Sequence, residues 1–398
     1  MAAFTSFSDF SEGSTPDFPA GLPVARIGLD AIRDNWLHLS SLAKDMPPMA
    51  VVKADAYGHG VEPVARTLVK AGCRTFAVGC VDDGVLLRKR LGESGKGVTI
   101  LPLLGILSAR DAAAAVANDL LPAVSSAEQA ALVSRAWTGE TPLPVAVKVE
   151  TGMSRLGFRA HETQSFIEAL RSLANLRPAL LLSHLAAADD PAKDATVAGQ
   201  VERFLAAYKA LREFWPGMAL SLANSAGLLA RDTLLGSLPP HIARPGYALY
   251  GGNPFAGTTR EALGRGLTPA MTVGAPVMGV HDLATGQTVS YGCTFQAKRN
   301  MRIAVVGAGY ADGFSRGLSG RGAVCIRGER CPVLGRICMQ MHVVDVSGVP
   351  EASSGDTAYL LGGEGPGAVS MDDLARDWGT IPYEVFCILG KNPRVYSA

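Results

Sequence analysis

Short apolar runs alternate with longer stretches in which apolar residues recur every three or four positions between residues 24 and 249. This alternation is typical of repeated strand–helix units around a parallel sheet. The short runs predict eight strands, near residues 50–52, 75–78, 98–103, 121–124, 145–149, 179–183, 219–222 and 241–243. The longer stretches predict helices at residues 31–42, 61–70, 81–90, 109–118, 127–136, 161–173 and 200–214, and a leading strand is expected at residues 25–29.

Eight parallel strands with intervening helices favour a TIM barrel, (β/α)8, over an open doubly wound sheet. After about residue 265 the pattern changes to alternating apolar and small residues with frequent glycine. A second, mostly β domain is expected there, with strands near residues 271–280, 289–291, 303–306 and 343–346 and a short helix near residues 371–378. The predicted organisation is an N-terminal arm (1–22), an α/β barrel domain (23–262) and a C-terminal β domain (263–398).

Composition narrows the class of protein and of partner. Of the 398 residues, 48% are hydrophobic and 18% are charged, which is ordinary for a soluble enzyme. The 37 Lys and Arg residues nearly balance the 36 Asp and Glu residues without a basic run, so we expect a small-molecule substrate and neither nucleic acid nor membrane. No signal peptide or membrane-length apolar segment is evident. The seven cysteines are odd in number and lack CxxC spacing, which argues against a disulfide framework or a metal site and favours the reducing cytoplasm.

A barrel brings the polar residues that end its strands to one rim, where the active site forms. The residues expected at this rim are Lys53, Lys148, Glu150, His184, Asn224, Ser225 and Arg244. Lys53 directly follows the apolar run 49–52, where desolvation would lower its pKa and favour a neutral amine that can hold an aldehyde as a Schiff base. Taken alone, a lysine that ends a strand is more often a solvated cap.

Several of these groups could bind an anionic, ring-containing cofactor. The Ser225 hydroxyl and the backbone N–H groups near Gly246 and Tyr247 could bind phosphate, although Asn224 or Ser225 could instead only cap a helix. Arg244 at the end of a strand could donate to a ring nitrogen of such a cofactor.

The other candidate site residues could each have a functional role or only a structural one. Arg155 lies in a glycine-punctuated loop and could hold a substrate carboxylate bidentately, or form a surface ion pair. His184 could contact a cofactor ring, or be an ordinary core histidine. Tyr291 could act as a general base if a cation such as Arg155 or His184 lowered its pKa, or pack its ring in the sheet. Tyr310, Tyr383 and the Met339 N–H could line the site, or belong to the core.

The segment VVKADAYGHG at residues 51–60 closely resembles the pyridoxal-phosphate lysine motif of alanine racemases. The segments at 147–157, 223–227, 244–247, 288–295 and 335–340 resemble further motifs of that family in the same order, and the resemblance runs from about residue 24 to the C-terminus. It implies a pyridoxal 5'-phosphate aldimine on Lys53, with Lys53 as the base acting on D-alanine and Tyr291 as the base acting on L-alanine. It also implies D-alanine supply for peptidoglycan.

The resemblance assigns the remaining roles as well. Arg155 and the Met339 N–H would bind the substrate carboxylate, and Arg244 would contact the pyridine nitrogen. Lys148 matches a lysine that is carbamylated in some members, where the carbamate orients the arginine. The family is a head-to-tail homodimer, so Tyr291 and Met339 would serve the partner subunit's Lys53. The residues implied for the phosphate are Tyr57, Ser225, Gly246, Tyr247 and Tyr383.

Two features of the sequence depart from the family pattern. Gln340 stands where the family usually has Asp, and the arm at residues 1–22 is longer than usual. The alternatives left open are a racemase of broader amino-acid specificity, a decarboxylase with the same two-domain architecture, and a non-catalytic pyridoxal-phosphate carrier protein built on a similar barrel.

Overall fold

The structure is a computed structural model that describes residues 23–43, 46–236 and 238–398. These residues form two compact units. The α/β unit comprises Arg26–Thr272 and Met371–Ala398, and the β unit comprises the described residues before Arg26 together with Val273–Ser370. The arm predicted at residues 1–22 lies outside the described residues.

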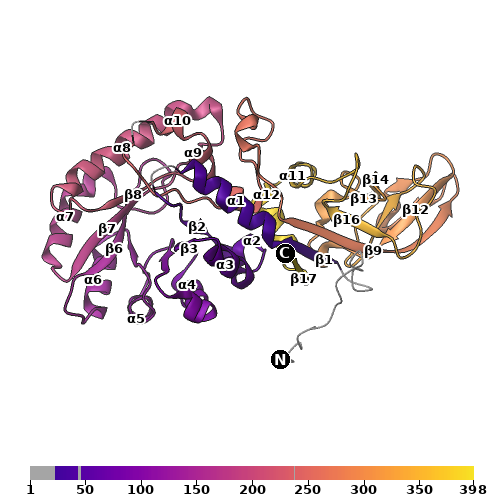
Figure 1. Cartoon of the computed structure of the whole chain (residues 1–398). Coiled ribbons are helices and arrows are strands. Elements are labelled where there is room, and N and C mark those ends of the chain that lie inside the picture. The colour runs from indigo at the N-terminus through magenta and orange to yellow at the C-terminus, as the bar shows by residue number, and fades with distance from the viewer. Residues whose placement is uncertain (1–22, 44–45, 237) are drawn as a thin grey trace. The chain divides into compact units, whose positions relative to one another are not determined.

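The α/β unit contains the short parallel strands that the apolar runs predict. β2 to β4 form one parallel sheet and β5 to β8 form another, with helices on their outer side (Figure 1). The strand residues are almost all buried, because the helices cover the sheets. The strands are β2 (Ala50–Val51), β3 (Thr75–Val78), β4 (Thr99–Pro102), β5 (Ala123–Val124), β6 (Leu143–Lys148), β7 (Leu176–Leu182) and β8 (Ala219–Ser221).

Helices lie between the strands, which confirms the helices that the longer stretches predict. In α3, for example, Val61, Val64, Ala65 and Leu68 form one buried face. The helices are α1 (Leu29–Leu42), α2 (Lys53–Tyr57), α3 (Val61–Lys70), α4 (Val81–Leu91), α5 (Ala109–Ala117), α6 (Ala127–Ala136), α7 (Thr163–Ser172), α8 (Asp194–Arg212), α9 (Ser225–Leu229), α10 (Arg231–Leu234), α11 (Met371–Trp378) and α12 (Pro382–Leu389).

The eighth predicted strand, at residues 241–243, is not a regular strand, so that prediction is wrong. Its backbone still forms hydrogen bonds with the neighbouring segments on both sides. Ile242 N–H donates to the Leu220 carbonyl (2.8 Å), and Met49 N–H donates to the Ala243 carbonyl (2.7 Å). Prolines at positions 239, 240 and 245 flank the segment and lack the N–H groups that would extend a ladder.

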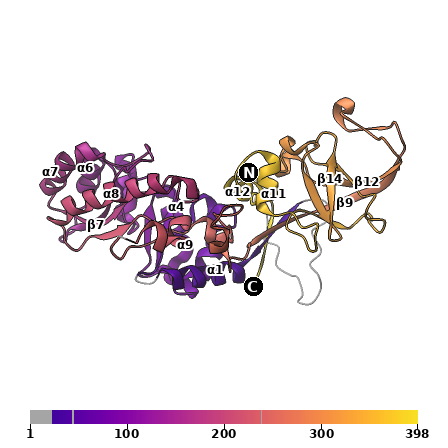
Figure 2. The same cartoon turned by 90° about the horizontal axis from the view of Figure 1, so that it is seen from above.

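The β unit is built on an antiparallel sheet that closes on itself. Its strand order is β12-β15-β14-β13-β16-β9, and a further pairing of β12 with β9 completes a six-stranded ring; β9, β12 and β14 can be followed in Figure 2. Leu283, Met301 and Ile303 are among the residues of its core. The strands are β9 (Met271–Leu283), which begins in the α/β unit, β10 (Thr288–Val289), β11 (Phe295–Gln296), β12 (Met301–Val306), β13 (Ala323–Ile326), β14 (Glu329–Leu334), β15 (His342–Asp345) and β16 (Thr357–Leu361).

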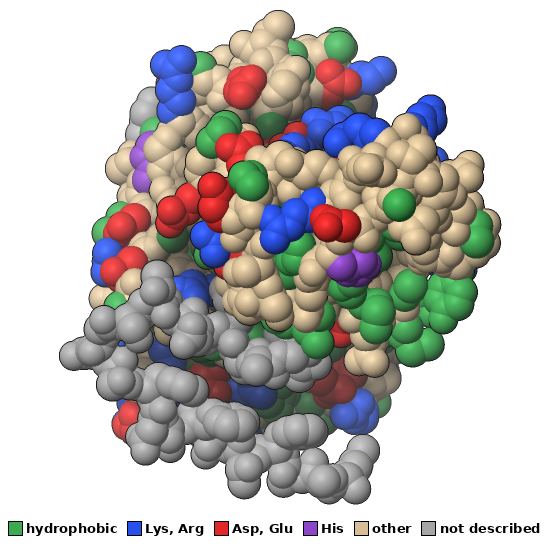
Figure 3. All heavy atoms as spheres, turned by 90° about the vertical axis from the view of Figure 1, so that its right-hand side faces the viewer, with side chains coloured by type: hydrophobic (Ala, Val, Ile, Leu, Met, Phe, Trp, Pro, Cys, Tyr) green, Lys and Arg blue, Asp and Glu red, His purple; other side chains and the backbone are tan. Residues whose placement is uncertain are grey.

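Two strands near the chain ends complete the description. β1 (Val24–Gly28) confirms the leading strand, and β17 (Arg394–Ser397) follows it in the strand order. On the face drawn in Figure 3, basic and acidic side chains are interspersed, in keeping with the formal net charge of +1. Within the described ranges, no helix combines the length and the apolar character needed to span a bilayer.

Candidate active site

Lys53 begins a turn with an unusual backbone. After β2, the residues Ala54, Asp55, Ala56 and Tyr57 all have φ between 53° and 56°. Together they form one turn wound in the left-handed sense, with Ala56 N–H donating to the Val52 carbonyl (3.0 Å). This conformation costs L-residues roughly 1–2 kcal/mol each, so surrounding contacts must hold the turn in place.

The Lys53 amine lies among groups that disfavour its charged form. Its side chain is exposed in the single chain, with Nζ 5.9 Å from the centre of the Tyr57 ring. Desolvation is the largest cause that lowers the pKa of Lys53, and the positive charge of Arg155 lowers it further. A neutral, nucleophilic amine is therefore more accessible here than on an ordinary surface lysine.

Arg244 is buried beside the strand ends, with 4% of its surface exposed. Its Nη1 donates to Ser221 Oγ (2.5 Å) and its Nη2 to the Ser183 carbonyl, both of which are neutral oxygen atoms. Burial lowers the pKa of Arg244 to about 10, which still leaves the guanidinium charged at neutral pH. A buried cation with neutral partners attracts an anion or an electron-rich acceptor.

Lys148 and His184 add two nitrogen bases to the same region. Lys148 is buried at the end of β6, where Nζ donates to the Leu103 carbonyl (3.1 Å). Desolvation, then Arg244 and Arg155, lower its pKa to about 8. Desolvation and the same two arginines lower the pKa of His184 to about 3, so its imidazole is neutral. The structure thus brings these predicted rim residues into one electropositive region.

The loop that carries Arg155 is fixed by a carboxylate. Glu150 Oε1 accepts from the backbone N–H groups of Gly152 (2.6 Å), Met153 (2.6 Å) and Ser154 (2.7 Å). Burial alone would raise the pKa of Glu150, but these donors outweigh it and lower the pKa. Glu150 therefore remains ionised and orders the loop, while the Arg155 side chain is exposed.

Ser225 and Gly246 form a small polar cradle. Ser225 Oγ accepts from the backbone N–H groups of Gly246 and Ala248, both at 3.1 Å, which leaves the hydroxyl proton for another acceptor. A Cβ atom at Gly246 would lie 2.5 Å from the Tyr57 Oη, so glycine is required for the tyrosine to reach this place. Asn224 caps α9 by accepting from Gly227 N–H (2.9 Å), as the alternative interpretation of the sequence expected.

Three tyrosines pack around this cradle. The Tyr247 and Tyr383 rings stack with their centres 4.4 Å apart, and the Tyr57 ring centre lies 6.1 Å from that of Tyr383. Burial raises the pKa of Tyr57 and Tyr247, and burial together with Asp189 raises that of Tyr383 to about 12. Their hydroxyl groups are therefore protonated donors. The Tyr247 hydroxyl, however, donates to Met371 Sδ (3.3 Å), so it supports the packing of α11.

In the β unit, Tyr291 lies at the tip of a hairpin between β10 and β11. The strand predicted at residues 289–291 ends at Val289, because Ser290, with φ 64°, turns the chain. Ser290 Oγ donates to the Arg336 carbonyl (2.5 Å), which fixes the base of the hairpin, while 70% of Tyr291 is exposed.

Tyr310 and Met339 lie on two hydrogen-bonded loops of the same unit. Tyr310 N–H donates to the Cys338 carbonyl (3.1 Å), and Ala311 N–H donates to the Met339 carbonyl (2.9 Å). The Tyr310 and Met339 side chains are 44% and 57% exposed, and Gln340 is exposed as well. The predicted site residues therefore fall into two groups, one in each unit.

Comparison with known proteins gives a consistent result over nearly the whole chain. Residues 27–254 match the family described as alanine racemase, N-terminal domain, and residues 270–396 match alanine racemase, C-terminal domain. An alanine racemase of Nitratidesulfovibrio vulgaris (strain DSM 19637 / Miyazaki F) is 47% identical over 374 residues, which cover 94% of this chain and 97% of that protein. The chain belongs to the alanine racemase family.

Solved structures of the alanine racemase family share the fold. The biosynthetic alanine racemase of Pseudomonas aeruginosa superposes with a TM-score of 0.81 at 34% identity, covering 95% of this chain and 99% of that one. The alanine racemase of Bartonella henselae, solved with covalently bound pyridoxal phosphate, gives a TM-score of 0.81 at 29% identity over 95% of this chain and 100% of that one. Membership makes this chain a racemase, an isomerase, that depends on pyridoxal phosphate.

The α/β unit fits that cofactor. A buried Arg244 without an acidic acceptor, an amine of lowered pKa at Lys53 and the Ser225 cradle supply a cation, a nucleophile and hydroxyl and N–H donors. These are the groups that a phosphorylated aromatic aldehyde needs. No cluster of His, Cys, Asp and Glu suited to a metal ion occurs in the part of the chain that the structure describes.

Gln200, which links the backbone next to His184 to Thr151, was not identified from the sequence. Gln200 Nε2 donates to the His184 carbonyl (2.9 Å) and to Thr151 Oγ1 (3.3 Å), which joins two strand ends through α8. Gln200 is fully buried among Val197, Val201 and other apolar residues of that helix. A polar residue on the apolar face of a helix was the signal that could have identified it.

Proposed function

We propose that this chain interconverts L-alanine and D-alanine with two proton-transferring groups, Lys53 and Tyr291, that act on opposite faces of the substrate. The observation that carries the proposal is Lys53 at the end of β2, with its pKa lowered beside Arg155, in a chain of the alanine racemase family. Inversion at Cα needs one group to take a proton from one face and another to return a proton to the other face. Lys53 acts on D-alanine and Tyr291 on L-alanine.

The residues of the α/β unit would hold pyridoxal phosphate. When bound, the cofactor supplies an electron-withdrawing ring that acidifies the Cα proton of an amino acid attached to it. Arg244 would donate to the ring nitrogen and keep a proton off it, which restrains side reactions such as amino transfer. The neutral His184 would pack beside the ring. The residues that would supply donors to the phosphate, with Tyr247 using its backbone N–H, are Tyr57, Asn224, Ser225, Gly246, Tyr247 and Tyr383.

Arg155, the Met339 N–H and Tyr310 would bind the alanine carboxylate. Lys148 assists if its amine combines with carbon dioxide, which forms a carbamate and releases one proton. The lowered pKa of Lys148, about 8, supports this reaction because the neutral amine is the species that reacts. The resulting negative charge would orient the Arg155 guanidinium.

The active enzyme would be a head-to-tail homodimer. Tyr291, Tyr310 and Met339 serve the partner subunit's Lys53 in this arrangement. Its support is the exposure of these three side chains, because a group that works in a water-poor site should be covered in the working assembly. The substrate itself is a small molecule, and its breadth beyond alanine depends on the size of the pocket in that assembly.

The parallel sheets would close into one eight-stranded (β/α)8 barrel. Leu121 N–H donates to the Ile100 carbonyl (2.9 Å) and so links β4 to β5. Residues 241–245 bond to β8 on one side and to β2 on the other. The domain boundaries at residues 23–262 and 263–398 stay a prediction, supported by the end of one family match at residue 254 and the start of the next at 270.

We place the enzyme in the cytoplasm, where it would supply D-alanine for peptidoglycan. The seven cysteines are all free thiols in the structure, which agrees with a reducing compartment.

Isotope exchange tests the reaction directly. Incubation with L-alanine in heavy water should yield D-alanine that carries deuterium at Cα. Borohydride should fix the pyridoxal group onto Lys53, and mass spectrometry of the digest reads the modified peptide. A panel of other amino acids under the same conditions measures specificity. Deuterium-free product, or a cofactor fixed to another lysine, would contradict the proposal.

A further inference from the structure

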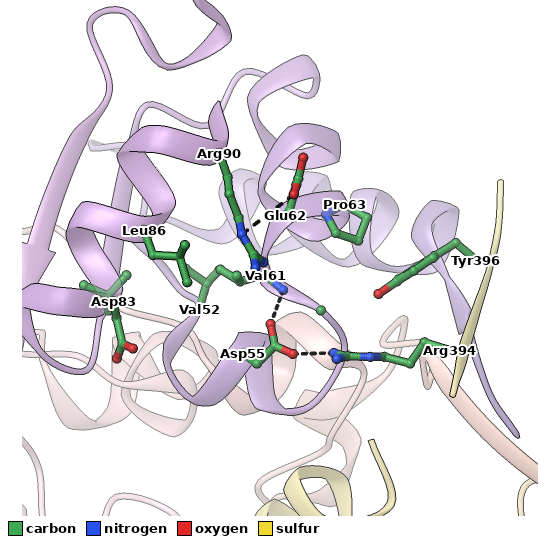
Figure 4. Close-up of a pocket in the computed structure, with 12 residues that line it drawn as sticks. Val52, Asp55, Val61, Glu62, Pro63, Asp83, Leu86, Arg90, Arg394 and Tyr396 are labelled. Carbon is green, nitrogen blue, oxygen red and sulfur yellow. Dashed lines mark hydrogen bonds and ion pairs between the residues drawn. The ribbon is translucent and has the colours of Figure 1, made fainter. Parts of the chain in front are cut away.

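The C-terminal strand β17 lies against the turn that carries Lys53. Arg394 Nη1 donates to Asp55 Oδ2 (2.5 Å), as Figure 4 shows, and to the Gly58 carbonyl (3.3 Å). One guanidinium therefore holds the turn at two points. Arg394 is 339 residues from Asp55 in the sequence. The C-terminal strand therefore reaches the connection between β2 and α3.

Asp55 links this strand to the next helix. Its other oxygen, Oδ1, accepts from the Val61 N–H (2.7 Å) at the start of α3. Figure 4 shows Asp55 between Val61 and Arg394. All three residues line a pocket of about 330 Å³. Burial would raise the pKa of Asp55, but the Val61 N–H and Arg394 outweigh it, so the carboxylate stays ionised.

The packing between the turn and the C-terminal segment leaves no room for side chains on the glycines involved. A Cβ atom at Gly60 would lie 2.1 Å from the Tyr396 Oη, and one at Gly390 would lie 2.2 Å from the Gly58 carbonyl oxygen. Both contacts bring the C-terminal segment against the end of the left-handed turn, where the backbone is strained.

We propose that Arg394, acting through the Asp55 carboxylate, is a positioning residue that holds Lys53 in place for proton transfer. The reason is local: Lys53 is two residues from Asp55 on a turn that L-residues do not adopt without support. Releasing the turn would displace the amine. The inference rests on the proposed role of Lys53 as the group that acts on D-alanine.

The ion pair should matter more for rate than for stability. The Arg394 and Asp55 side chains are 25% and 43% exposed, and such pairs contribute little to the free energy of unfolding. A displacement of a reacting group by about 1 Å, in contrast, can reduce a rate by up to ~100-fold.

The test compares four single variants of the holoenzyme. Arg394→Met removes the charge, Arg394→Lys retains it, and Asp55→Asn keeps an acceptor for Val61 N–H in a residue that tolerates the left-handed conformation. Arg260→Met is the matched control, because Arg260 pairs with Asp194 at similar exposure (16% and 40%) elsewhere in the α/β unit. We expect kcat to fall roughly tenfold in Arg394→Met and Asp55→Asn, partly recover in Arg394→Lys and stay unchanged in Arg260→Met.

A direction-specific readout separates positioning from general damage. The kinetic isotope effect of Cα-deuterated D-alanine should rise in Arg394→Met, because only the Lys53 step is slowed, while that of deuterated L-alanine should not rise. The double variant Asp55→Asn/Arg394→Met should be no slower than either single variant, since both break one interaction.

Two results would overturn the inference. One is a normal kcat in Arg394→Met. The other is a loss of rate in which both isotope effects change by the same factor and the melting temperature also changes. If Arg394→Met does not fold, the Asp55→Asn isotope effects decide alone. Failure of the proposed function is distinguishable, because unlabelled product in heavy water or a cofactor on another lysine would appear already in the unaltered enzyme.

Discussion

The two groups of site residues differ in how much of their environment a single chain supplies. In the α/β unit, Arg244 and Ser225 are each 4% exposed. Arg244 is fixed by hydrogen bonds to residues at the ends of β7 and β8, and Ser225 accepts from the backbone of Gly246 and Ala248. In the β unit, Tyr291 and Met339 are 70% and 57% exposed on loops. Folding of the α/β unit alone prepares groups for a cofactor, whereas the tyrosine is presented outward. We therefore expect cofactor binding and proton transfer to respond separately to mutation.

Tyr291→Phe is expected to show the largest difference between the effect on proton transfer and the effect on cofactor binding. The change removes only the hydroxyl group, so kcat should fall by roughly 10²–10⁴-fold, the usual contribution of a general acid–base group. The absorbance of the bound cofactor should be unchanged, because its candidate contacts lie in the α/β unit. Tyr208→Phe on α8 provides the matched control, and a Tyr291→Phe enzyme as active as this control would refute the two-base assignment.

Mixing subunits tests whether the two groups meet across a dimer. Lys53→Ala and Tyr291→Phe chains are each inactive in this proposal. If the site is shared, random reassociation should restore about a quarter of the wild-type activity, because half of the dimers then contain one intact site of two. The measurement is activity after joint unfolding and refolding of an equimolar mixture. No recovery, with heterodimers demonstrated by distinct tags, would place both groups in one chain.

A smaller effect is expected for Lys148→Met. Loss of the negative charge beside Arg155 should raise the KM for alanine about tenfold, as for one charge-assisted hydrogen bond. In the unaltered enzyme the pKa of Lys148 is lowered to about 8, so the neutral amine increases as pH rises through that value, and the proposed carbamate should increase with it. KM should fall over the same range, and Lys148→Met should lack this dependence. Titration of KM at fixed bicarbonate concentration measures both, and an identical pH profile in the variant would exclude the carbamate.

Elements with strong periodicity could be predicted from the sequence. The helices at residues 61–70 and 127–136 and the strand at 75–78 have the predicted bounds in the structure. Their buried positions follow from the spacing of apolar residues alone. α12 was missed, because its sequence is apolar on nearly every side and therefore has little helical periodicity, although Pro382 at its first turn was a start signal.

The candidate site was predictable in part for a related reason. Residues that directly follow the apolar runs lie at one edge of the parallel strands. This rule identified Lys53, Lys148 and Arg244. The contacts that hold them join residues far apart in the chain, such as Arg394 with Asp55, and no local pattern encodes such pairs. The left-handed turn was equally inaccessible, because Ala and Tyr have no preference for that conformation.

The handedness of that turn has a consequence for chemical synthesis of the protein. A right-handed coil suits L-residues and its mirror image suits D-residues, so residues 54–57 are wound in the sense that the enzyme's own product would favour. Ala54 is exposed. A semisynthetic enzyme with D-alanine at this position would relax the backbone beside the Lys53 amine.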